Sequence, residues 1–267
     1  MGVVMADEII TRQDGAAGII QFNRPHARNA LTDAMLTQTR AAMQTWELDK
    51  TIAAIILTGD DKAFCAGGDV KGTASSDMAA FDKYRHRYTQ SVWHDFMRYL
   101  SRYTKPLIAA VEGYALGGGL EIALRCDFIV GSSTARLGLT EAKIGLFPIL
   151  GGAWSLTHAV GERKARELAY TGRRIDAQEA LDLGLLNHLT DPGAAVTKSV
   201  QIAQDIAECA PLSVMALKQA INRAGQQTYD QALTEGGDLS ALLMFSDDRK
   251  EGLAAFMEKR KPGFKGA

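Results

Sequence analysis

Residues 105–127 read KPLIAAVEGYALGGGLEIALRCD, a stretch that combines a strand signal, a glycine-rich loop and a helix signal. The apolar run at residues 107–111 is typical of a strand buried on both faces of a parallel sheet. A glycine-rich loop at residues 113–121 follows and leads into a helix that we expect to begin near Leu120. Adjacent glycines expose backbone N–H groups at a helix N-terminus, where the helix dipole favours developing negative charge. The stretch therefore predicts a strand, a loop with anion-binding potential and a helix.

A second glycine-containing loop, AFCAGGDVK at residues 63–71, follows another apolar run at residues 52–57. That run also predicts a strand buried in a parallel sheet. Either loop alone is weak evidence for a site, because such turns often serve only to connect a strand to a helix. Neither matches the dinucleotide fingerprint or the phosphate-binding P-loop. Two such loops from two strands, however, offer a pair of N–H donors that can converge on one oxyanion.

The remaining segments predict an α/β chain with its strands early and its helices late. Apolar residues on either side of Asp14 and Gly15 predict a β-hairpin. Thr32 and Asp33 supply a cap and an acidic residue at the start of a helix. Further expected elements are a helix over residues 31–46, a long amphipathic helix with aromatic side chains over residues 81–103, a short buried strand over residues 128–130, and an almost wholly helical region after residue 152.

Composition excludes several classes of protein. The chain has 267 residues and a mass of 28.8 kDa, with 46% hydrophobic and 23% charged residues. These values are typical of one large globular domain, alone or with an appendage, and they exclude disordered and disulfide-scaffold proteins. A net charge of −1 argues against binding to nucleic acid or to an anionic membrane. No leader-like segment and no bilayer-spanning apolar stretch is recognised, so we expect a cytoplasmic protein.

Motifs for metals and for nucleophilic catalysis are lacking. Cys65, Cys126 and Cys209 are widely spaced, without a CxxC pair, and are expected to be reduced thiols. The chain has neither a GxSxG nucleophile elbow nor an HExxH zinc motif, and no metal is expected. The histidines show no ligand spacing, and each is interpreted as a surface or core residue: His26, His86, His94, His158 and His188.

Two carboxylates are candidates for proton transfer. Glu121 follows the last glycine of its loop, where an acidic residue is often present only for the helix dipole. Glu141, taken alone, reads as a loop residue beside Lys143. Together, the two carboxylates favour a catalytic interpretation, because adding water across a double bond needs one group to accept a proton and another to donate one. Asp69 and Lys71 either contact a ligand or only solvate a helix start.

Several motifs run along nearly the whole chain. They are NRPHARNAL at residues 23–31, AFCAGGDVK, the 105–127 stretch, the segment through Glu141, TGRRIDAQEALDLGL at residues 171–185 and the terminal EKRKPGFK. In this order they resemble the crotonase, or enoyl-CoA hydratase/isomerase, superfamily. The resemblance implies an α/β fold: a crotonase-like spiral of repeated ββα units with a coenzyme A thioester site over residues 1–195, and a helical C-terminal region for packing and trimerisation over residues 196–267. It also implies an acyl-CoA substrate, no separate cofactor, and a trimer or dimer of trimers.

The same resemblance assigns roles to site residues. The backbone N–H groups of Gly68 and Gly118 would form an oxyanion hole for the thioester oxygen. Glu121 would activate water for attack at C3 and Glu141 would protonate C2, since family members with glutamate at both positions look like hydratases. Lys71 or Lys259 would lie near the phosphates, with Lys259 from its own or a neighbouring subunit. The implied coenzyme A contacts are Arg28, Ala66, Asp69, Val70, Lys71, Leu116 and Lys259.

One segment departs from the family pattern. Where hydratases of this family usually read PGxGGTQRL, this chain reads FPILGGAWSL over residues 147–156. Ile149 and Leu150 place bulk near the second carboxylate, and with Trp154 they are expected to line the acyl pocket. The bulk favours a short, substituted enoyl group over a long fatty acyl chain.

Within the family, the chain looks most like members that hydrate 3-methylthioacryloyl-CoA in dimethylsulfoniopropionate breakdown. Water added to the carbon that carries the methylthio group would expel methanethiol, and coupled thioester hydrolysis would yield acetaldehyde, CO₂ and coenzyme A. The alternatives are a general short-chain enoyl-CoA hydratase acting on crotonyl-CoA, a CoA-thioester hydrolase, and a non-catalytic CoA- or RNA-binding scaffold. The low net charge and the two carboxylates argue against the scaffold.

The C-terminal region contains an apolar stretch that is too rich for a lone surface helix. We expect it to contribute to assembly, although packing on the core would explain it almost as well. Its members are Leu239, Leu242, Leu243, Phe245, Leu253 and Phe256.

Overall fold

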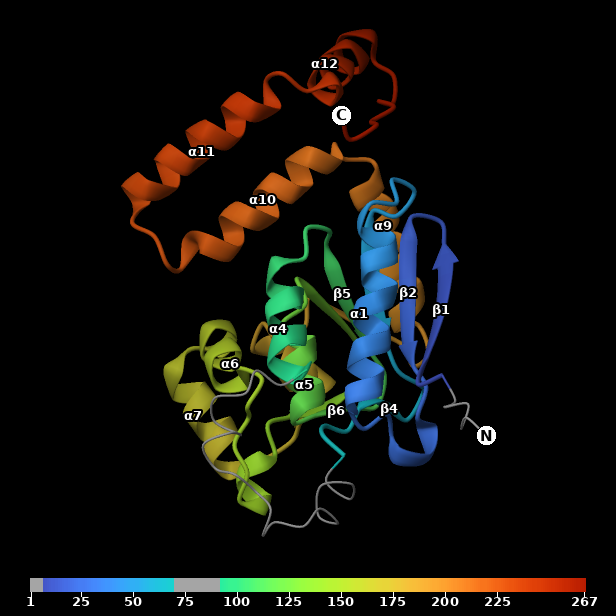
Figure 1. Ribbon diagram of the computed structural model, residues 1–267. Coiled ribbons are helices and arrows are strands. Elements are labelled where there is room, and N and C mark those ends of the chain that lie inside the picture. Colours follow the sequence, from blue (N-terminus) through green and yellow to red (C-terminus); the bar gives the residue numbers. More distant parts are fainter. Residues whose placement is uncertain (1–6, 70–91) are drawn as a thin grey trace.

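The computed structural model describes residues 7–69 and 92–267. Figure 1 shows two parts: a body that contains the β-sheets, and an arm of C-terminal helices that extends away from it. The expected α/β architecture is confirmed.

The larger sheet has six strands in the order β1-β2-β3-β5-β7-β10. The predicted hairpin is formed by β1 and β2, and Gly15 in its turn has a φ of 54°, a left-handed conformation that favours glycine. The other neighbouring strands run parallel. The bounds are β1 Ile9–Asp14, β2 Ala17–Phe22, β3 Ala54–Thr58, β5 Leu107–Val111, β7 Phe128–Ser132 and β10 His188–Thr190.

A smaller sheet has the order β4-β6-β8-β9. Its strands are β4 Ala63–Cys65, β6 Tyr114–Leu116, β8 Arg136–Gly138 and β9 Ile175–Asp176. Successive strands alternate between the two sheets, since β3 and β4, β5 and β6, and β7 and β8 each divide between the larger and the smaller sheet. This alternation winds the chain into the spiral that the resemblance implied.

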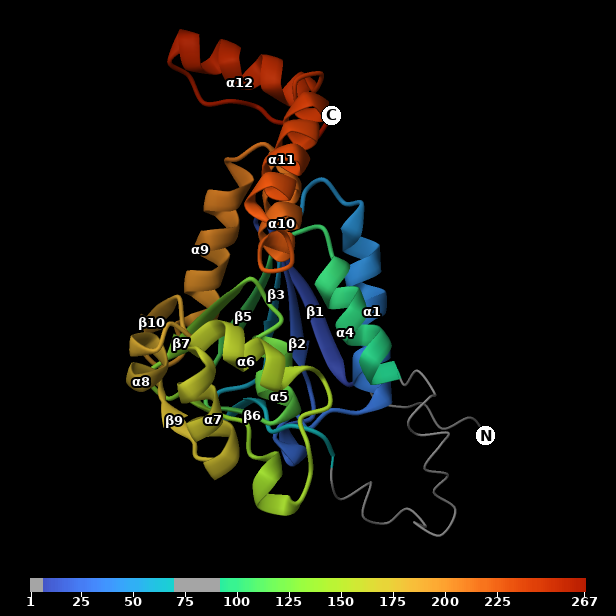
Figure 2. The same ribbon diagram turned by 90° about the vertical axis from the view of Figure 1, so that its left-hand side faces the viewer.

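Helices cover both faces of the larger sheet. Figure 2 shows α1 (Asp33–Glu47) and α4 (Val92–Arg102) on one face and α9 (Ala195–Ala207) on the other. Alternate side chains of β3 enter two separate buried clusters, one shared with α1 and α4 and the other with α9. Burial on both faces explains why residues 52–57 form an uninterrupted apolar run.

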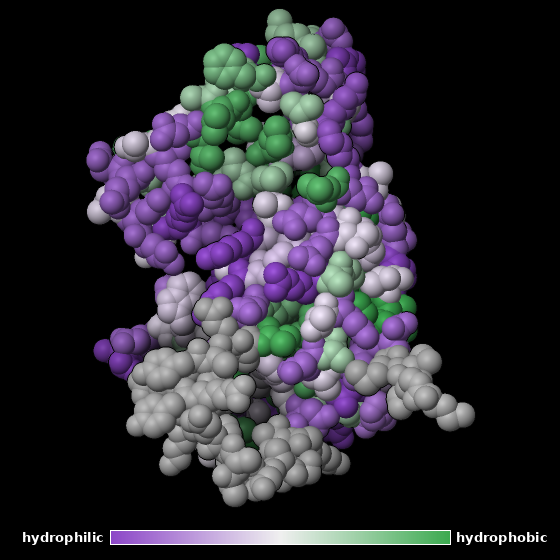
Figure 3. All heavy atoms as spheres, in the orientation of Figure 1, coloured by the Kyte–Doolittle hydropathy of each residue, from purple (hydrophilic) through white to green (hydrophobic). Residues whose placement is uncertain are grey.

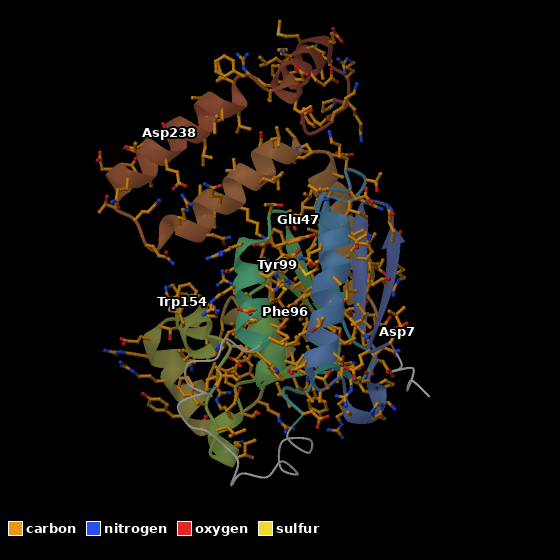
Figure 4. The ribbon with its side chains drawn as sticks, in the orientation of Figure 1. Asp7, Glu47, Phe96, Tyr99, Trp154 and Asp238 are labelled. Carbon is orange, nitrogen blue, oxygen red and sulfur yellow. The ribbon has the colours of Figure 1, made fainter. Side chains whose placement is uncertain are left out.

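The first helix begins as its sequence predicts. The side chain of Thr32 accepts a hydrogen bond from the N–H of Met35, and Asp33 occupies the first turn. The helices α1 and α4 also contact each other. Figure 4 labels Phe96 and Tyr99 on α4 and Glu47 on α1. The Tyr99 hydroxyl donates to Glu47 at 3.2 Å, which ties the two helices together.

The body also contains short helices between the strands. They are η1 Pro25–Ala27, α5 Gly118–Ala123, η3 Glu141–Ile144, α6 Gly152–Val160, α7 Glu162–Thr171 and α8 Ala177–Asp182. The region after residue 152 is mainly helical as expected, but it also supplies β9 and β10. Of the helix expected over residues 81–103, residues 92–102 form α4, and the first part of the range lies outside the described residues.

The arm consists of α10 (Pro211–Ala224), α11 (Tyr229–Leu243) and α12 (Asp247–Glu258). Neither α10 nor α11 has a buried residue, whereas α9 packs on the larger sheet. The arm therefore begins at α10, while α9 belongs to the body. Within the described ranges, no helix is long and apolar enough to cross a membrane.

Candidate active site

Three neighbouring strands of the smaller sheet lead into the site. The strands β4, β6 and β8 are parallel, and the chain continues from them to Gly68, Gly118 and Glu141 respectively. Because the carboxyl ends of parallel strands meet at the same edge of a sheet, these segments converge although they are far apart in the sequence. The sequence indicated the two glycine loops but not this sheet.

The loops containing Gly68 and Gly118 are in close contact. A Cβ built on Gly67 would lie 3.5 Å from the amide nitrogen of Gly118, and a Cβ on Gly118 would lie 3.7 Å from the amide nitrogen of Gly68. Among the described residues, neither of the two N–H groups makes a hydrogen bond. The predicted pair of donors is therefore brought together and is available to an oxyanion.

Two glycines permit this approach. Gly117 has a φ of 51°, a left-handed conformation that other residues rarely adopt. A Cβ on Gly119 would lie 2.3 Å from the carbonyl oxygen of Cys65, so any larger residue would separate the loops. The run of glycines in the sequence is thus explained by backbone geometry and close packing.

Glu121 lies in α5 and is buried, with 2% of its surface exposed. Its Oε1 accepts hydrogen bonds from the N–H groups of Leu150 at 2.8 Å and Gly152 at 2.7 Å. The pKa of Glu121 is raised from an ordinary value of 4.5 to about 7, because burial and the nearby charge of Glu141 outweigh the opposing effect of the two N–H donors. A carboxyl with a pKa near neutrality is suited to exchange protons.

A third glycine makes room for this carboxylate. A Cβ on Gly152 would lie 2.7 Å from Cγ and 2.9 Å from Oε1 of Glu121. The residue was part of the atypical 147–156 segment, but the sequence carried no signal that it holds Glu121.

Glu141 is the first residue of η3 and lies beside the glycine loop. A Cβ on Gly117 would be 3.2 Å from Oε1 of Glu141. Its Oε2 is buried and has no hydrogen-bond partner among the described residues, and burial raises the pKa of this carboxyl. The structure thus brings both predicted carboxylates to the paired N–H donors.

Several predicted coenzyme A contacts lie near these loops. Ala66 donates its N–H to the carbonyl of Arg28 at 3.0 Å, so the two are neighbours. Arg28 is exposed and lies over the ring of Tyr114, 5.5 Å from its centre. Leu116 is buried at the end of β6, directly before the glycine loop.

The other residues predicted to contact coenzyme A are paired with a protein side chain, lie far from the glycine loops or fall outside the described residues. The carboxylate of Asp69 forms an ion pair with Arg24 at 2.9 Å. Lys259 caps the end of α12, which lies at the opposite end of the molecule from β4 and β6 in Figures 1 and 2. Val70 and Lys71 lie outside the described residues.

The residues predicted for the acyl pocket differ in their surroundings. Leu150 is buried, and its Cδ1 would lie 3.6 Å from a Cβ on Gly118. Ile149 and Trp154 are about half exposed, at 50% and 49%. Trp154, labelled in Figure 4, stacks on His158 and carries the guanidinium of Arg125 over its ring. Of the three, Leu150 is thus placed beside the glycine loop.

Besides Gly152, three further residues at the site were not predicted. Leu31 would touch a Cβ on Gly118 at 3.1 Å, and Trp93 would touch a Cβ on Gly68 at 3.5 Å. His94 lies beside the carbonyl of Ile149. Leu31 was within a quoted motif, but Trp93 and His94 had no signal beyond their residue types.

A separate cavity of about 670 Å³ lies between the body and the arm. Its lining includes Tyr103, Arg125, Lys218 and Leu243, and none of the residues that form the site. In the part of the chain that the structure describes, no cluster of three or more histidine, cysteine or acidic residues is placed to hold a metal ion.

Comparison with known proteins agrees with the fold. The sequence profile of the enoyl-CoA hydratase/isomerase family matches residues 12–267. The chain is 37% identical over 261 residues to a short-chain-enoyl-CoA hydratase of Clostridium acetobutylicum, covering 97% of this chain and 98% of the relative. It is 36% identical over 262 residues to the 2,3-dehydroadipyl-CoA hydratase of Escherichia coli, covering 98% and 100%.

A solved structure gives the same result. The crystal structure of an enoyl-CoA hydratase subunit from Geobacillus kaustophilus matches with a TM-score of 0.89 and 37% identity, covering 97% of this chain and 98% of that one. The fold is therefore that of the crotonase class. The chain belongs to the enoyl-CoA hydratase/isomerase family.

Proposed function

We propose that this chain is an enoyl-CoA hydratase that adds water across the 2,3 double bond of a short-chain acyl-CoA. The observation that carries the proposal is the meeting of Glu121 and Glu141 beside the N–H groups of Gly68 and Gly118, which make no hydrogen bond within residues 7–69 and 92–267. A single carboxylate would suffice for moving a double bond, whereas adding water needs one group to take a proton and one to give it. No cofactor beyond the coenzyme A of the substrate is required.

In this mechanism the N–H groups of Gly68 and Gly118 bind the thioester oxygen, where negative charge develops as water attacks C3. Glu121 takes a proton from the attacking water. Glu141 delivers a proton to C2, and its unpartnered Oε2 is the oxygen suited to this step. A pKa of about 7 for Glu121 leaves a substantial fraction ionised at neutral pH and still basic enough to accept a proton.

Coenzyme A would lie along the outer side of the glycine loops, where Arg28, Ala66 and Leu116 are grouped. Asp69, together with Val70 and Lys71 that follow it in the sequence, is proposed to complete this contact. Lys259 is carried by α12 at the far end of the arm, so its proposed contact with the phosphates requires a neighbouring subunit.

The acyl group is proposed to be short, as in crotonyl-CoA, because buried Leu150 lies beside Gly118 and Glu121 and limits the space. The two named relatives act on different acyl groups, so family membership does not choose among them. Ile149 and Trp154 are proposed to border the same pocket.

A second candidate substrate is 3-methylthioacryloyl-CoA, favoured by the bulky Ile149 and Leu150 after Pro148. Water added at the carbon carrying the methylthio group gives a hemithioacetal, which expels methanethiol and leaves an aldehyde. Hydrolysis of the thioester at the same oxyanion site would release coenzyme A, and the resulting malonate semialdehyde would lose CO₂ to give acetaldehyde. The comparisons support general hydration better than this narrower activity.

A competition separates the two substrates. The purified protein is given equal concentrations of crotonyl-CoA and 3-methylthioacryloyl-CoA, and the products are followed by mass spectrometry. Faster hydration of crotonyl-CoA without free coenzyme A supports the general hydratase. Prior consumption of the methylthio substrate with release of methanethiol supports the narrower activity, and failure to hydrate either substrate contradicts the proposal. A saturated acyl-CoA in the same assay detects a plain thioester hydrolase.

We also propose that the arm, which is the part of the expected assembly region (residues 196–267) that begins at α10, serves assembly into a trimer or a dimer of trimers. Figure 3 shows apolar side chains gathered on the arm above the body. Leu242, Phe245, Leu253 and Phe256 are each more than half exposed, at 73%, 85%, 52% and 80%. Exposed apolar surface of this kind marks an interface. Sedimentation that shows only a 29 kDa monomer would contradict the proposal.

A further inference from the structure

One peptide group connects the catalytic carboxylate to α4. The N–H of Leu150 donates to Glu121 Oε1 at 2.8 Å. The carbonyl of Ile149 accepts from Nε2 of His94 at 3.2 Å. This carbonyl and this N–H belong to the same planar unit, since both flank the bond between Ile149 and Leu150. One rigid group therefore has Glu121 at one end and His94 at the other.

The residue before His94 reaches the other half of the site. The ring of Trp93 would be 3.5 Å from a Cβ on Gly68, and its Nε1 donates to Asp33 at 2.6 Å. Two adjacent residues of α4 thus lie against two loops: Trp93 lies beside the loop of Gly68, and His94 bonds to the loop of Ile149 and Leu150. This helix fixes the position of one loop relative to the other.

We propose that His94 is a positioning residue for Glu121, acting through the peptide between Ile149 and Leu150. The hydrogen bond at the carbonyl holds the plane of the peptide, so that its N–H points at Oε1. It also polarises the peptide, which makes the N–H a stronger donor. The inference rests on the proposed function, because it assigns Glu121 the role of the base.

The direction of the effect follows from the surroundings of Glu121. Burial and the charge of Glu141 raise the pKa of Glu121, and the N–H groups of Gly152 and Leu150 lower it. Weakening the Leu150 donor would therefore let the pKa rise. A base with a higher pKa is ionised only at higher pH, so the acid limb of the kcat/KM profile moves upward.

The test compares three side chains at position 94. His94→Leu removes the donor, His94→Asn keeps a donor with too short a reach, and His94→Gln keeps a donor at about the reach of Nε2. We expect kcat for crotonyl-CoA to fall about 10- to 100-fold in the Leu and Asn variants with little change in KM, and to recover most of its value in the Gln variant. Asp95→Leu is the control, because Asp95 is on the same helix and pairs with surface Arg98.

A second measurement does not depend on turnover. The carboxyl carbon of Glu121 is titrated by ¹³C NMR in substrate-free protein, with the signal assigned by its loss in Glu121→Gln. We expect its pKa to rise by about half a unit to one unit in His94→Leu and to return in His94→Gln.

The inference is overturned if Glu121 titrates identically in the wild type and the Leu variant, or if the Gln variant behaves like the Leu variant. If no enoyl-CoA is hydrated but the NMR shift is found, the proposed function fails and the link between His94 and Glu121 stands. Thermal unfolding of each variant shows whether it is globally destabilised. If His94→Leu is destabilised, the comparison of His94→Asn with His94→Gln tests the inference instead.

Discussion

The two glutamates of the site are both withdrawn from water, but they are held in different ways. Glu121 is held by N–H groups of Leu150 and Gly152, which lie about thirty residues further along the chain. The N–H groups that lower the pKa of Glu141 belong to Thr140 and to Glu141 itself. Tertiary structure thus places the first carboxylate, whereas a local turn places the second. The difference fits the proposed roles, in which Glu121 as the base must be aimed at a water and Glu141 as the acid needs an available oxygen to deliver its proton.

The largest effect is expected for Glu121→Gln. The amide cannot accept a proton from water, so we expect kcat to fall about 10²- to 10⁴-fold. Its oxygen can still accept the two N–H bonds, and the fold should be retained. Loss of enoyl absorbance measures the rate, with Glu162→Gln as the control, because the side chain of Glu162 on α7 is exposed. A fall of less than about threefold would show that the base lies elsewhere.

Removal of the second carboxyl should have a similar or somewhat smaller effect. Glu141→Gln leaves the attack of water intact but removes the donor to C2, and we expect a loss of about 10²-fold or more in kcat. If the two groups act in one reaction, the double variant should be little worse than Glu121→Gln alone. Losses that multiply fully would contradict the shared mechanism.

A smaller effect tests how Glu121 is held. In Gly152→Ala the new methyl would lie 2.7 Å from Glu121 Cγ, so the carboxylate must shift, and we expect kcat to fall roughly 10- to 100-fold. The matched control is Gly184→Ala. Gly184 has a φ of 75° and nothing within 4 Å of an added Cβ, so this change strains the backbone without touching the site. Equal losses of activity in the two variants would indicate a general effect of stability.

A further expected effect concerns stability and pH rather than turnover. The pKa of Glu121 is raised in the folded protein to about 7 from an ordinary value of 4.5, so the folded state binds this proton more tightly than the unfolded state. The contribution of this carboxyl to stability therefore falls as pH rises from 4.5 to 7. Glu121→Gln removes this dependence on pH. We therefore expect the free energy of unfolding of the variant, relative to the wild type, to be higher at pH 8 than at pH 5 by at most about 3 kcal/mol. Urea unfolding at both values checks this, and the absence of a difference would show that the carboxyl is not desolvated.

The sequence predicted the elements that carry a strong local signal. Residues 107–111 form a buried strand as expected, Thr32 caps its helix, and the glycine run opens α5. The strands of the smaller sheet are two or three residues long, too short to show an alternating pattern, and they were not recognised.

The candidate site divides in the same way. Gly68, Gly118, Glu121 and Glu141 were identified from loops, mechanism and resemblance, and the structure brings them together. The roles of Gly152 and His94 depend on a contact across the fold, and a single residue type carries no sign of such a contact. Residues that carry a motif or a chemical role of their own could be predicted, whereas residues that act only by contacting another segment could not.

The small size of the strands that lead into the site has a consequence for folding. The strands β4, β6 and β8 are three residues each, so few backbone hydrogen bonds can join each of them to its neighbours in the sheet. A partly opened molecule can keep the larger sheet, and with it much of its helical and strand circular dichroism, while its three site segments separate. Inactivation in mild denaturant should therefore precede spectroscopic unfolding, and amide exchange of the smaller sheet should follow the loss of turnover.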